Sequence, residues 1–262
     1  MTGAHSGLVV NDEGALRRCT LARVERRNAL SQKLCTELES AIESAGPDIA
    51  LVAIDHEGDT FSSGADLREL VPNLTTADRK PGDSATLRAI WSLFGAIETA
   101  DQPVIALVDG RCIAGGLELA LACDLIAATS SARFLDAHLA GGLLPGGGAA
   151  IRLAERIGRS RSFRMLVEGI EVDSDQAVDW GLVDVAAATR AELDSWLRML
   201  ADRVAAYPMG LVRGIKKQLN ASRHPRDGQR FHMELDELET YVSRSREELR
   251  AGLARYVDRS AP

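Results

Sequence analysis

The sequence of 262 residues predicts an α/β fold of stacked strand–helix units that ends in a run of helices. Two segments, offset by about 50 residues, look like one device repeated. Residues 49–55 lead into 61–67 (Phe-Ser-Ser-Gly-Ala-Asp-Leu), and residues 103–109 lead into 112–119 (Cys-Ile-Ala-Gly-Gly-Leu-Glu-Leu). Each segment combines an apolar β-branched strand, a turn with glycine, and an acid–leucine pair that opens a helix. This internal repeat favours stacked units over an open dinucleotide-binding sheet.

Local signals predict the elements around the two segments. The turn signal at 11–14 separates apolar residues 8–10 from 15–21, so we predict an opening hairpin. Ser31 can cap a helix that continues to residue 44, because apolar side chains recur on one face of that stretch. Further predicted elements are a helix at 86–99, a buried strand at 124–128 and a helix at 149–157.

Two polar stretches are interpreted as loops, and the end of the chain as helical. Residues 71–85 contain two prolines and should form a loop beside the first turn, and residues 133–148 should form a second loop. The predicted helices of the end are 160–168, 174–180, 191–206, 210–221, 230–246 and 247–256. We therefore divide the chain into a core, residues 1–185, and a C-terminal helical region, residues 186–262.

Composition excludes several classes of protein. The net charge of −7 argues against a general nucleic-acid binder. No apolar run approaches the ~18 residues that span a bilayer, and residues 1–11 lack the features of a signal peptide, so we expect a cytoplasmic protein without membrane contact. The cysteines, none of them in a Cys-x-x-Cys motif, predict reduced thiols and no metal site; they are Cys19, Cys35, Cys112 and Cys123.

The two turns predict an oxyanion-binding device. Backbone N–H groups in the first turn of a helix have no acceptor within that helix. Two such turns side by side would offer two N–H donors to one oxygen, which is how enzymes stabilise a developing enolate or tetrahedral intermediate. Glu118 opens the second helix, three residues after Gly115, and would lie on the same face as the predicted donors. An acid at this position can equally serve the helix dipole.

These motifs, in this order, resemble those of the crotonase (enoyl-CoA hydratase/isomerase) superfamily over nearly the whole chain. Residues 26–30 (Arg-Arg-Asn-Ala-Leu) are similar to an early segment of the family. Residues 61–67 and 110–120, with Cys123-Asp124, match its two signatures. The stretch 169–183 and the ending Gly252…Tyr256 are also similar.

The resemblance implies a spiral of ββα repeats followed by a helical trimerisation region, assembled as a homotrimer or homohexamer. It implies an acyl-CoA thioester ligand whose carbonyl oxygen lies between the N–H groups of Ser63 and Gly115, with no separate cofactor and no metal. It places Arg26 or Arg27 near the phosphates of coenzyme A and the backbone of Ala65, Asp66 and Leu67 near the adenine. Ala29 is a further predicted binding residue, and Gly116, beside Gly115, would let the backbone approach a ligand closely.

Glu118 matches the glutamate that the family uses as a general acid or base. The chain departs from the hydratase pattern at the second glutamate, because the matching run, 134–138, reads Phe-Leu-Asp-Ala-His, so His138 stands in its place. A neutral imidazole can act as a base near pH 7. Asp136 is the other nearby carboxylate and would either orient His138 or act itself. A loop histidine that only fills space is the plain alternative.

We expect an enzyme that hydrates 2-enoyl-CoA thioesters of fatty acid metabolism through the oxyanion site, Glu118 and His138. The loss of the second glutamate leaves a CoA-thioester hydrolase, a decarboxylase or an isomerase open as alternatives. A non-catalytic acyl-CoA-binding protein and a structural oligomerisation module are alternatives of other classes. The glycine-rich stretch 141–148 lacks the ending of a phosphate-binding loop, so we interpret it as a turn that lines the acyl pocket.

Overall fold

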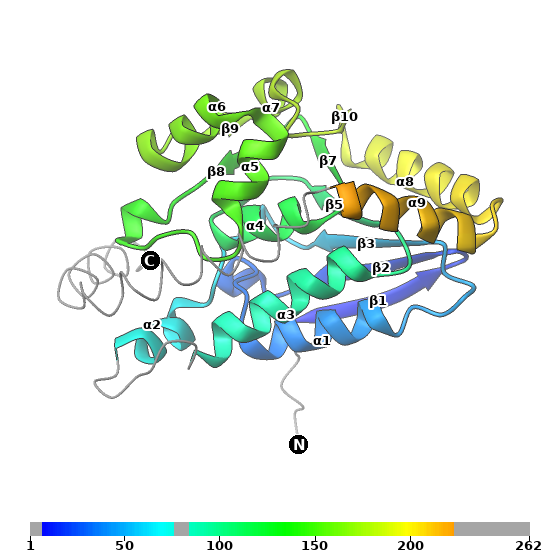
Figure 1. The fold of residues 1–262 in the computed structure, drawn as a ribbon, viewed down its shortest axis with the longest axis horizontal. Helices are drawn as coiled ribbons and strands as arrows, with labels where there is room; N and C mark the ends of the chain where they lie inside the picture. Colours follow the sequence, from blue (N-terminus) through cyan, green and yellow to red (C-terminus); the bar gives the residue numbers. More distant parts are fainter. Residues whose placement is uncertain (1–6, 76–83, 223–262) are drawn as a thin grey trace.

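The computed structural model describes residues 7–75 and 84–222, which form two β-sheets surrounded by helices (Figure 1). The larger sheet has the strand order β1-β2-β3-β5-β7-β10 and the smaller one β4-β6-β8-β9. The strands of the larger sheet are β1 (Leu8–Glu13), β2 (Leu16–Leu21), β3 (Leu51–His56), β5 (Val104–Val108), β7 (Leu125–Thr129) and β10 (Val185–Ala187). Those of the smaller sheet are β4 (Thr60–Ser62), β6 (Arg111–Ile113), β8 (Arg133–Leu135) and β9 (Val172–Asp173).

Strand pairs repeat along the chain, and each pair places one strand in each sheet. β3 and β4, β5 and β6, and β7 and β8 follow one another in sequence, and each pair leads into one or more helices. Within the larger sheet β2, β3, β5, β7 and β10 run parallel, and within the smaller sheet β4, β6 and β8 do. The predicted spiral of ββα repeats is therefore confirmed in the described residues.

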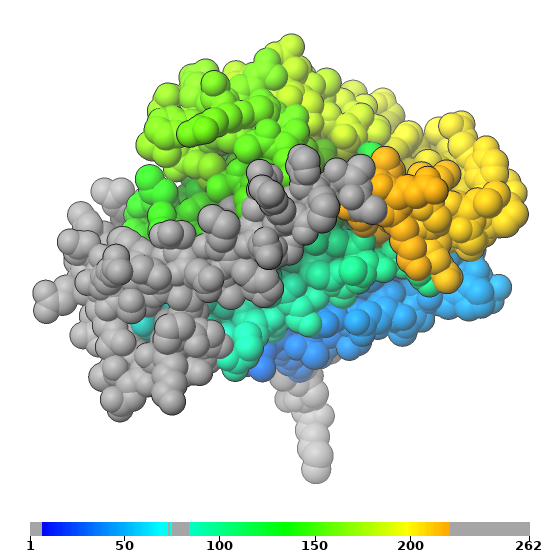
Figure 2. Space-filling view, in the orientation of Figure 1, coloured from blue at the N-terminus to red at the C-terminus, as the bar shows by residue number. Residues whose placement is uncertain are grey.

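Helices cover both faces of the larger sheet (Figure 1). Successive side chains along a strand point to opposite faces, so each strand packs against helices on both sides. Ile54 and Val104 pack with residues of α1, α3 and α4, whereas Leu51 and Ile105 pack against α8. The helices are α1 (Gln32–Glu43), α2 (Leu67–Thr75), α3 (Ala85–Thr99), α4 (Gly115–Ala122), α5 (Ala149–Ile157), α6 (Arg159–Phe163), α7 (Ser174–Trp180), α8 (Arg190–Ala205) and α9 (Met209–Ser222). Figure 2 shows α8 and α9, in yellow and orange, at one end of the molecule.

Most predicted elements are found where local signals placed them. The opening hairpin is β1 and β2, which pair antiparallel. The Ser31 side chain accepts a hydrogen bond from the Leu34 N–H at 3.2 Å and caps α1 as predicted. α3, α5 and α7 also lie where they were predicted. The predicted helices at 230–246 and 247–256 lie outside the described residues.

Three predictions about elements are wrong. Residues 71–75 belong to α2, which continues through Pro72, because burial of Leu70 and Leu74 against Leu87 outweighs the lost backbone hydrogen bond. The predicted loop 133–148 begins with β8, whose pairing with β6 buries Phe134 completely. The end of the chain is not wholly helical, because β9 belongs to the smaller sheet and β10 to the larger one.

No helix among the described residues is long and apolar enough to cross a membrane.

Candidate active site

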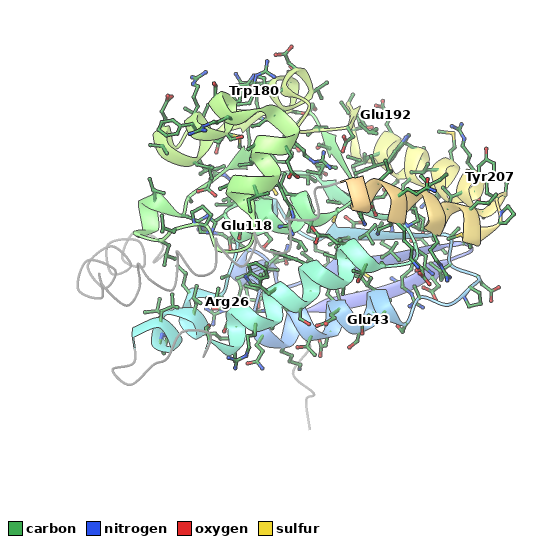
Figure 3. The ribbon with its side chains drawn as sticks, in the orientation of Figure 1. Arg26, Glu43, Glu118, Trp180, Glu192 and Tyr207 are labelled. Carbon is green, nitrogen blue, oxygen red and sulfur yellow. The ribbon has the colours of Figure 1, made fainter. Side chains whose placement is uncertain are left out.

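A largely apolar pocket lies where α2, α3, the start of α4 and the loop after β8 meet. Its walls are apolar faces of α2 and α3, and its polar side chains include Glu118 near the start of α4 and His138 in the loop after β8. The lining residues are Ser63, Ala65, Leu67, Leu70, Leu74, Leu87, Ile90, Trp91, Ala114, Gly115, Glu118, Ala137, His138, Gly141, Leu143, Leu144, Gly146 and Gly147. The stretch 141–148 lines the pocket as predicted. Glu118 lies in the middle of the molecule (Figure 3).

Two backbone N–H groups face this pocket side by side. Gly115 is the first residue of α4, so its N–H has no acceptor within the helix. The residues on either side of Ala65 both bond to Leu30: the Gly64 carbonyl oxygen accepts the Leu30 N–H, and the Asp66 N–H donates to the Leu30 carbonyl oxygen. The N–H of Ala65 points to the side of the backbone opposite Leu30. A Cβ atom added to Gly115 would lie 3.1 Å from the Ala65 nitrogen. Within the described residues neither N–H donates to a protein acceptor.

The structure corrects the predicted pair of donors. The Ser63 N–H donates to the Arg27 carbonyl oxygen at 3.0 Å and is therefore not available to a ligand. The N–H of Ala65, two residues further on, stands beside that of Gly115 instead. The sequence shows the turn but not which of its N–H groups pairs with residues 27–30, so this distinction needed the structure.

Glu118 is a buried carboxyl group held at one oxygen. Its Oε1 accepts hydrogen bonds from the N–H groups of Gly147 at 2.8 Å and Ala149 at 3.2 Å. Its Oε2 lies 3.8 Å from Nε2 of His138. Burial raises the pKa of Glu118 above its ordinary value, and the nearby Asp136 acts in the same direction, while His138 and the two N–H donors oppose the shift. The protonated form of Glu118 is thus favoured more than that of an exposed glutamate.

Asp136 orients His138. One Asp136 oxygen lies 2.8 Å from Nδ1 of His138, and the other accepts the His138 backbone N–H at 3.1 Å. A carboxylate only accepts hydrogen bonds, so Nδ1 carries the proton and Nε2 is the nitrogen that turns toward Glu118. In the structure Asp136 contacts His138, and His138 in turn faces Glu118. The side chain of Asp136 is fully buried and does not line the pocket.

The other predicted binding residues divide into two groups. Ala65 and Leu67 line the pocket. Asp66 forms an ion pair with Arg23 at 3.0 Å, and the same arginine donates a hydrogen bond to the Ala29 carbonyl oxygen. A side chain on Gly116 would collide with the carbonyl group of Ser62, so this glycine serves the contact between α4 and β4. Arg26, Arg27 and these three residues are not among those that line the pocket.

Sequence reasoning missed the groups that hold the polar side chains of the pocket. The N–H donors of Gly147 and Ala149 belong to a loop and a helix start whose approach to Glu118 depends on tertiary packing. Trp91, which lines the pocket and donates from Nε1 to the Gly146 carbonyl oxygen at 2.7 Å, carried no motif. The glycine run at 146–148 was the available signal, because glycine permits such close approach.

Comparison with known proteins identifies the family of the chain. The family model described as enoyl-CoA hydratase/isomerase matches residues 11–262. The chain belongs to the enoyl-CoA hydratase/isomerase family, the crotonase superfamily. The chain is 30% identical to the 2,3-dehydroadipyl-CoA hydratase of Escherichia coli (strain K12) over 223 residues, which covers 83% of each protein. It is 29% identical to a probable enoyl-CoA hydratase of Mycobacterium bovis over 251 residues, covering 93% of this chain and 91% of that one.

Solved structures of this family share the fold. An enoyl-CoA hydratase from Mycobacterium avium subsp. paratuberculosis superposes with a TM-score of 0.82 at 26% identity, covering 96% of this chain and 99% of that one. An enoyl-CoA hydratase from Bacillus halodurans is similar in fold, with a TM-score of 0.86 at 24% identity and coverage of 95% and 99%. The predicted crotonase-like α/β fold is confirmed.

Proposed function

We propose that this protein hydrates 2-enoyl-CoA thioesters with Glu118 and His138 as the acid–base pair. The observation that carries the proposal is the convergence of three features on one pocket: the N–H groups of Ala65 and Gly115, the buried Glu118, and Nε2 of His138 at 3.8 Å from it. Hydration needs one acid, one base and a stabilised thioester oxygen, and this pocket supplies each of them.

The proton balance of the reaction suits a pair that shares one proton. Water forms a C–O bond to the β-carbon and gives a proton to the member that acts as base. The other member gives its proton to the α-carbon, while the two backbone N–H groups hold the negative charge of the enolate oxygen. The pair begins and ends with a single proton, so a carboxyl and an imidazole can replace the two glutamates of the hydratase pattern.

Product identity tests this proposal. Purified protein is incubated with crotonyl-CoA, and the products are separated by chromatography. The proposal expects 3-hydroxybutyryl-CoA with no free thiol. Recovery of unchanged crotonyl-CoA together with tight binding of it would contradict catalysis and support the non-catalytic acyl-CoA-binding alternative.

One observation favours thioester hydrolysis as the second candidate. The Asp136–His138 contact at 2.8 Å is the arrangement by which enzymes activate water or a hydroxyl group as a nucleophile. The same two N–H groups would then stabilise a tetrahedral intermediate. Release of free coenzyme A from saturated butyryl-CoA, which has no double bond to hydrate, would establish this reaction.

Further proposals concern the surroundings of the site. The coenzyme is part of the substrate, so we propose a reaction without metal or separate cofactor, in the cytoplasm. We also propose assembly as a homotrimer or homohexamer through the C-terminal region, 186–262. Exposed apolar side chains on one face of α9, spaced four residues apart, support this assembly; they are Leu211, Ile215 and Leu219.

A further inference from the structure

A buried arginine behind the active site contacts the same loop that holds Glu118. Arg152 lies on α5, and its side chain is only 5% exposed. It donates from Nη1 to the carbonyl oxygen of Gly147, whose N–H in turn donates to Glu118 Oε1. Arg152 is not among the residues that line the pocket, so any effect of Arg152 on the pocket would pass through this loop.

The guanidinium group is fixed on its other sides. Its Nε and Nη2 atoms both donate to Glu98 Oε1, at 3.0 and 2.8 Å. Its central carbon lies 5.7 Å from the ring centroid of Phe94. An arginine held by a carboxylate and an aromatic ring presents its remaining N–H groups in a fixed direction. In Arg152, Nη1 points to the carbonyl oxygen of Gly147.

The loop that Arg152 holds has little freedom to move relative to Glu118. A Cβ atom added to Gly147 would lie 2.5 Å from Glu118 Oε2 and 2.8 Å from Phe94. Gly148 adopts a φ of 99°, which favours glycine. Because both N–H donors to Oε1 come from this turn, a shift of the turn would rotate the carboxyl group and change the direction in which Oε2 faces His138.

We propose that Arg152, anchored by Glu98, is a positioning residue that sets the orientation of the Glu118 carboxyl group through the Gly147–Ala149 turn. The proposal rests on the proposed role of Glu118 in proton transfer. It distinguishes Arg152 from an ordinary buried ion pair, which would stabilise α5 against α3 without affecting the reaction.

The chain offers a matched control on the same helix. Arg156, one turn further along α5, also binds one carboxylate, Asp184 Oδ2 at 2.8 Å, and backbone carbonyl groups, those of Leu182 at 3.2 Å and Asp124 at 3.5 Å. Its side chain is 14% exposed, and its partners lie outside the glycine loop. Arg156→Gln therefore measures the cost of losing such a pair without disturbing Glu118.

The first readout is steady-state kinetics on crotonyl-CoA. Arg152→Gln is expected to lower kcat about 10- to 100-fold, the scale of a small misplacement of a catalytic group, with KM nearly unchanged because no pocket contact is lost. Arg152→Lys, which keeps the charge but not the fork of donors, should recover part of that loss. Arg156→Gln should leave kcat at the wild-type value.

The second readout does not depend on turnover. The titration of Glu118 is followed by NMR of protein labelled with ¹³C at the glutamate carboxyl groups, and the resonance is assigned by its absence in Glu118→Gln. In Arg152→Gln the midpoint should move upward, because weaker N–H donation and a lost positive charge both disfavour the carboxylate. In Arg156→Gln it should stay in place.

The outcomes separate the two proposals. Unchanged kcat and an unchanged Glu118 midpoint in Arg152→Gln would overturn the positioning role, as would an equal loss of kcat in Arg156→Gln. If the wild-type protein does not hydrate crotonyl-CoA, the proposed function fails, and the NMR titration alone decides whether Arg152 positions Glu118. If Arg152→Gln does not fold, both measurements are made on Arg152→Lys and Glu98→Gln. In these variants kcat should fall and the Glu118 midpoint should rise, each by less than in Arg152→Gln.

Discussion

At the scale of single residues, Asp136 decides which nitrogen of His138 faces the pocket. Both Asp136 oxygens bind this histidine, at the ring Nδ1 and at the backbone N–H. Asp136→Asn keeps the size of the side chain but can present an amide NH₂ group to Nδ1, which would favour the tautomer with its proton on Nε2. We expect a loss in kcat of about 100-fold, the lower end of what a general base contributes.

Steady-state kinetics with Asp173→Asn as the control check this prediction. Asp173 caps α7 away from the pocket, and asparagine also caps helices well. An Asp136→Asn variant as active as Asp173→Asn would show that Asp136 has no part in the reaction.

Glu118 should reduce the stability of the folded protein at neutral and alkaline pH. Because burial raises the pKa of its carboxyl group in the folded protein, ionisation costs more there than in the unfolded chain. The wild type therefore bears no penalty at pH below the unfolded pKa of Glu118, and it loses stability as the pH rises from that value through the folded pKa. Glu118→Gln avoids this penalty, so its Tm should exceed that of the wild type at high pH and match it at low pH.

Thermal unfolding between pH 4 and 8 measures this difference, with the exposed Glu155→Gln on α5 as the control. A Tm difference between Glu118→Gln and wild type that shrinks as the pH rises would contradict the pKa shift.

Residue types at the site were predictable, and their hydrogen-bond partners were not. Glu118, His138 and Gly115 carry recognisable motifs, and all three line the pocket. Whether Ser63 or Ala65 offers the second N–H depends on pairing with residues 27–30, which are separated from them by more than 30 positions in the chain. From the sequence, Asp136 could either orient His138 or act itself, and only the structure shows its contact with the histidine.

At the scale of elements, the start of α4 depends on a close approach of two backbones. A Cβ atom on Gly116 would collide with the carbonyl group of Ser62 in β4, and the neighbouring Gly115 carries one of the free N–H groups. We expect Gly116→Ala to destabilise the protein by about 1–3 kcal/mol, because backbone atoms would have to move apart. Activity should fall with it, because the separation of the Gly115 and Ala65 N–H groups changes.

Gly95→Ala is the matched control, because Gly95 lies within helix α3 and an added Cβ atom there would meet nothing within 4 Å. It should be neutral or stabilising by a few tenths of a kcal/mol. Equal unfolding free energies for Gly116→Ala and Gly95→Ala, measured with denaturant, would contradict the close approach.

Helix α9 contacts the core through the buried Lys216, together with the Arg213–Asp101 ion pair and a hydrogen bond from Asn220 to the Glu98 carbonyl oxygen. Lys216 Nζ lies 2.7 Å from Asp124 Oδ2 and donates to the carbonyl oxygens of Ile97 at 2.9 Å and Gln102 at 3.0 Å. Lys216→Met would remove this donor from the Ile97 and Gln102 carbonyl oxygens, while Asp124 Oδ2 would keep the N–H of Val104. The change should cost about 1–3 kcal/mol. Lys217→Met, at the exposed neighbouring position, should change the unfolding free energy little. A Lys216→Met variant as stable as Lys217→Met would show that α9 is held by other contacts.

Elements with a clear local signal could be predicted, and the three-residue strands could not. α1, α5 and α7 have caps or clear apolar periodicity. β4, β6 and β8 have three residues each, too few to show a period of two, and each is defined by its neighbours in the smaller sheet. The second strand of every ββα repeat was therefore missing from the prediction.

At the scale of the whole molecule, the two sheets bring distant turns to one pocket. Parallel pairing of β4 with β6 places the turn after Ser62 beside the turn after Ile113, which is why Ala65 and Gly115 are neighbours. Pairing of β6 with β8 then brings His138 to the same place. The repeat seen in the sequence is thus the physical origin of the site.

The central claim is that Glu118 and His138 act as one pair in adding water to an enoyl thioester. A double-mutant cycle tests it most directly, with loss of the conjugated enoyl-thioester absorbance of crotonyl-CoA as the assay for wild type, Glu118→Gln, His138→Ala and the double variant. A shared-proton pair predicts that the double variant is about as slow as either single variant, because removing one member already disables the other. Turnover that survives His138→Ala, or losses that multiply in the double variant, would contradict it.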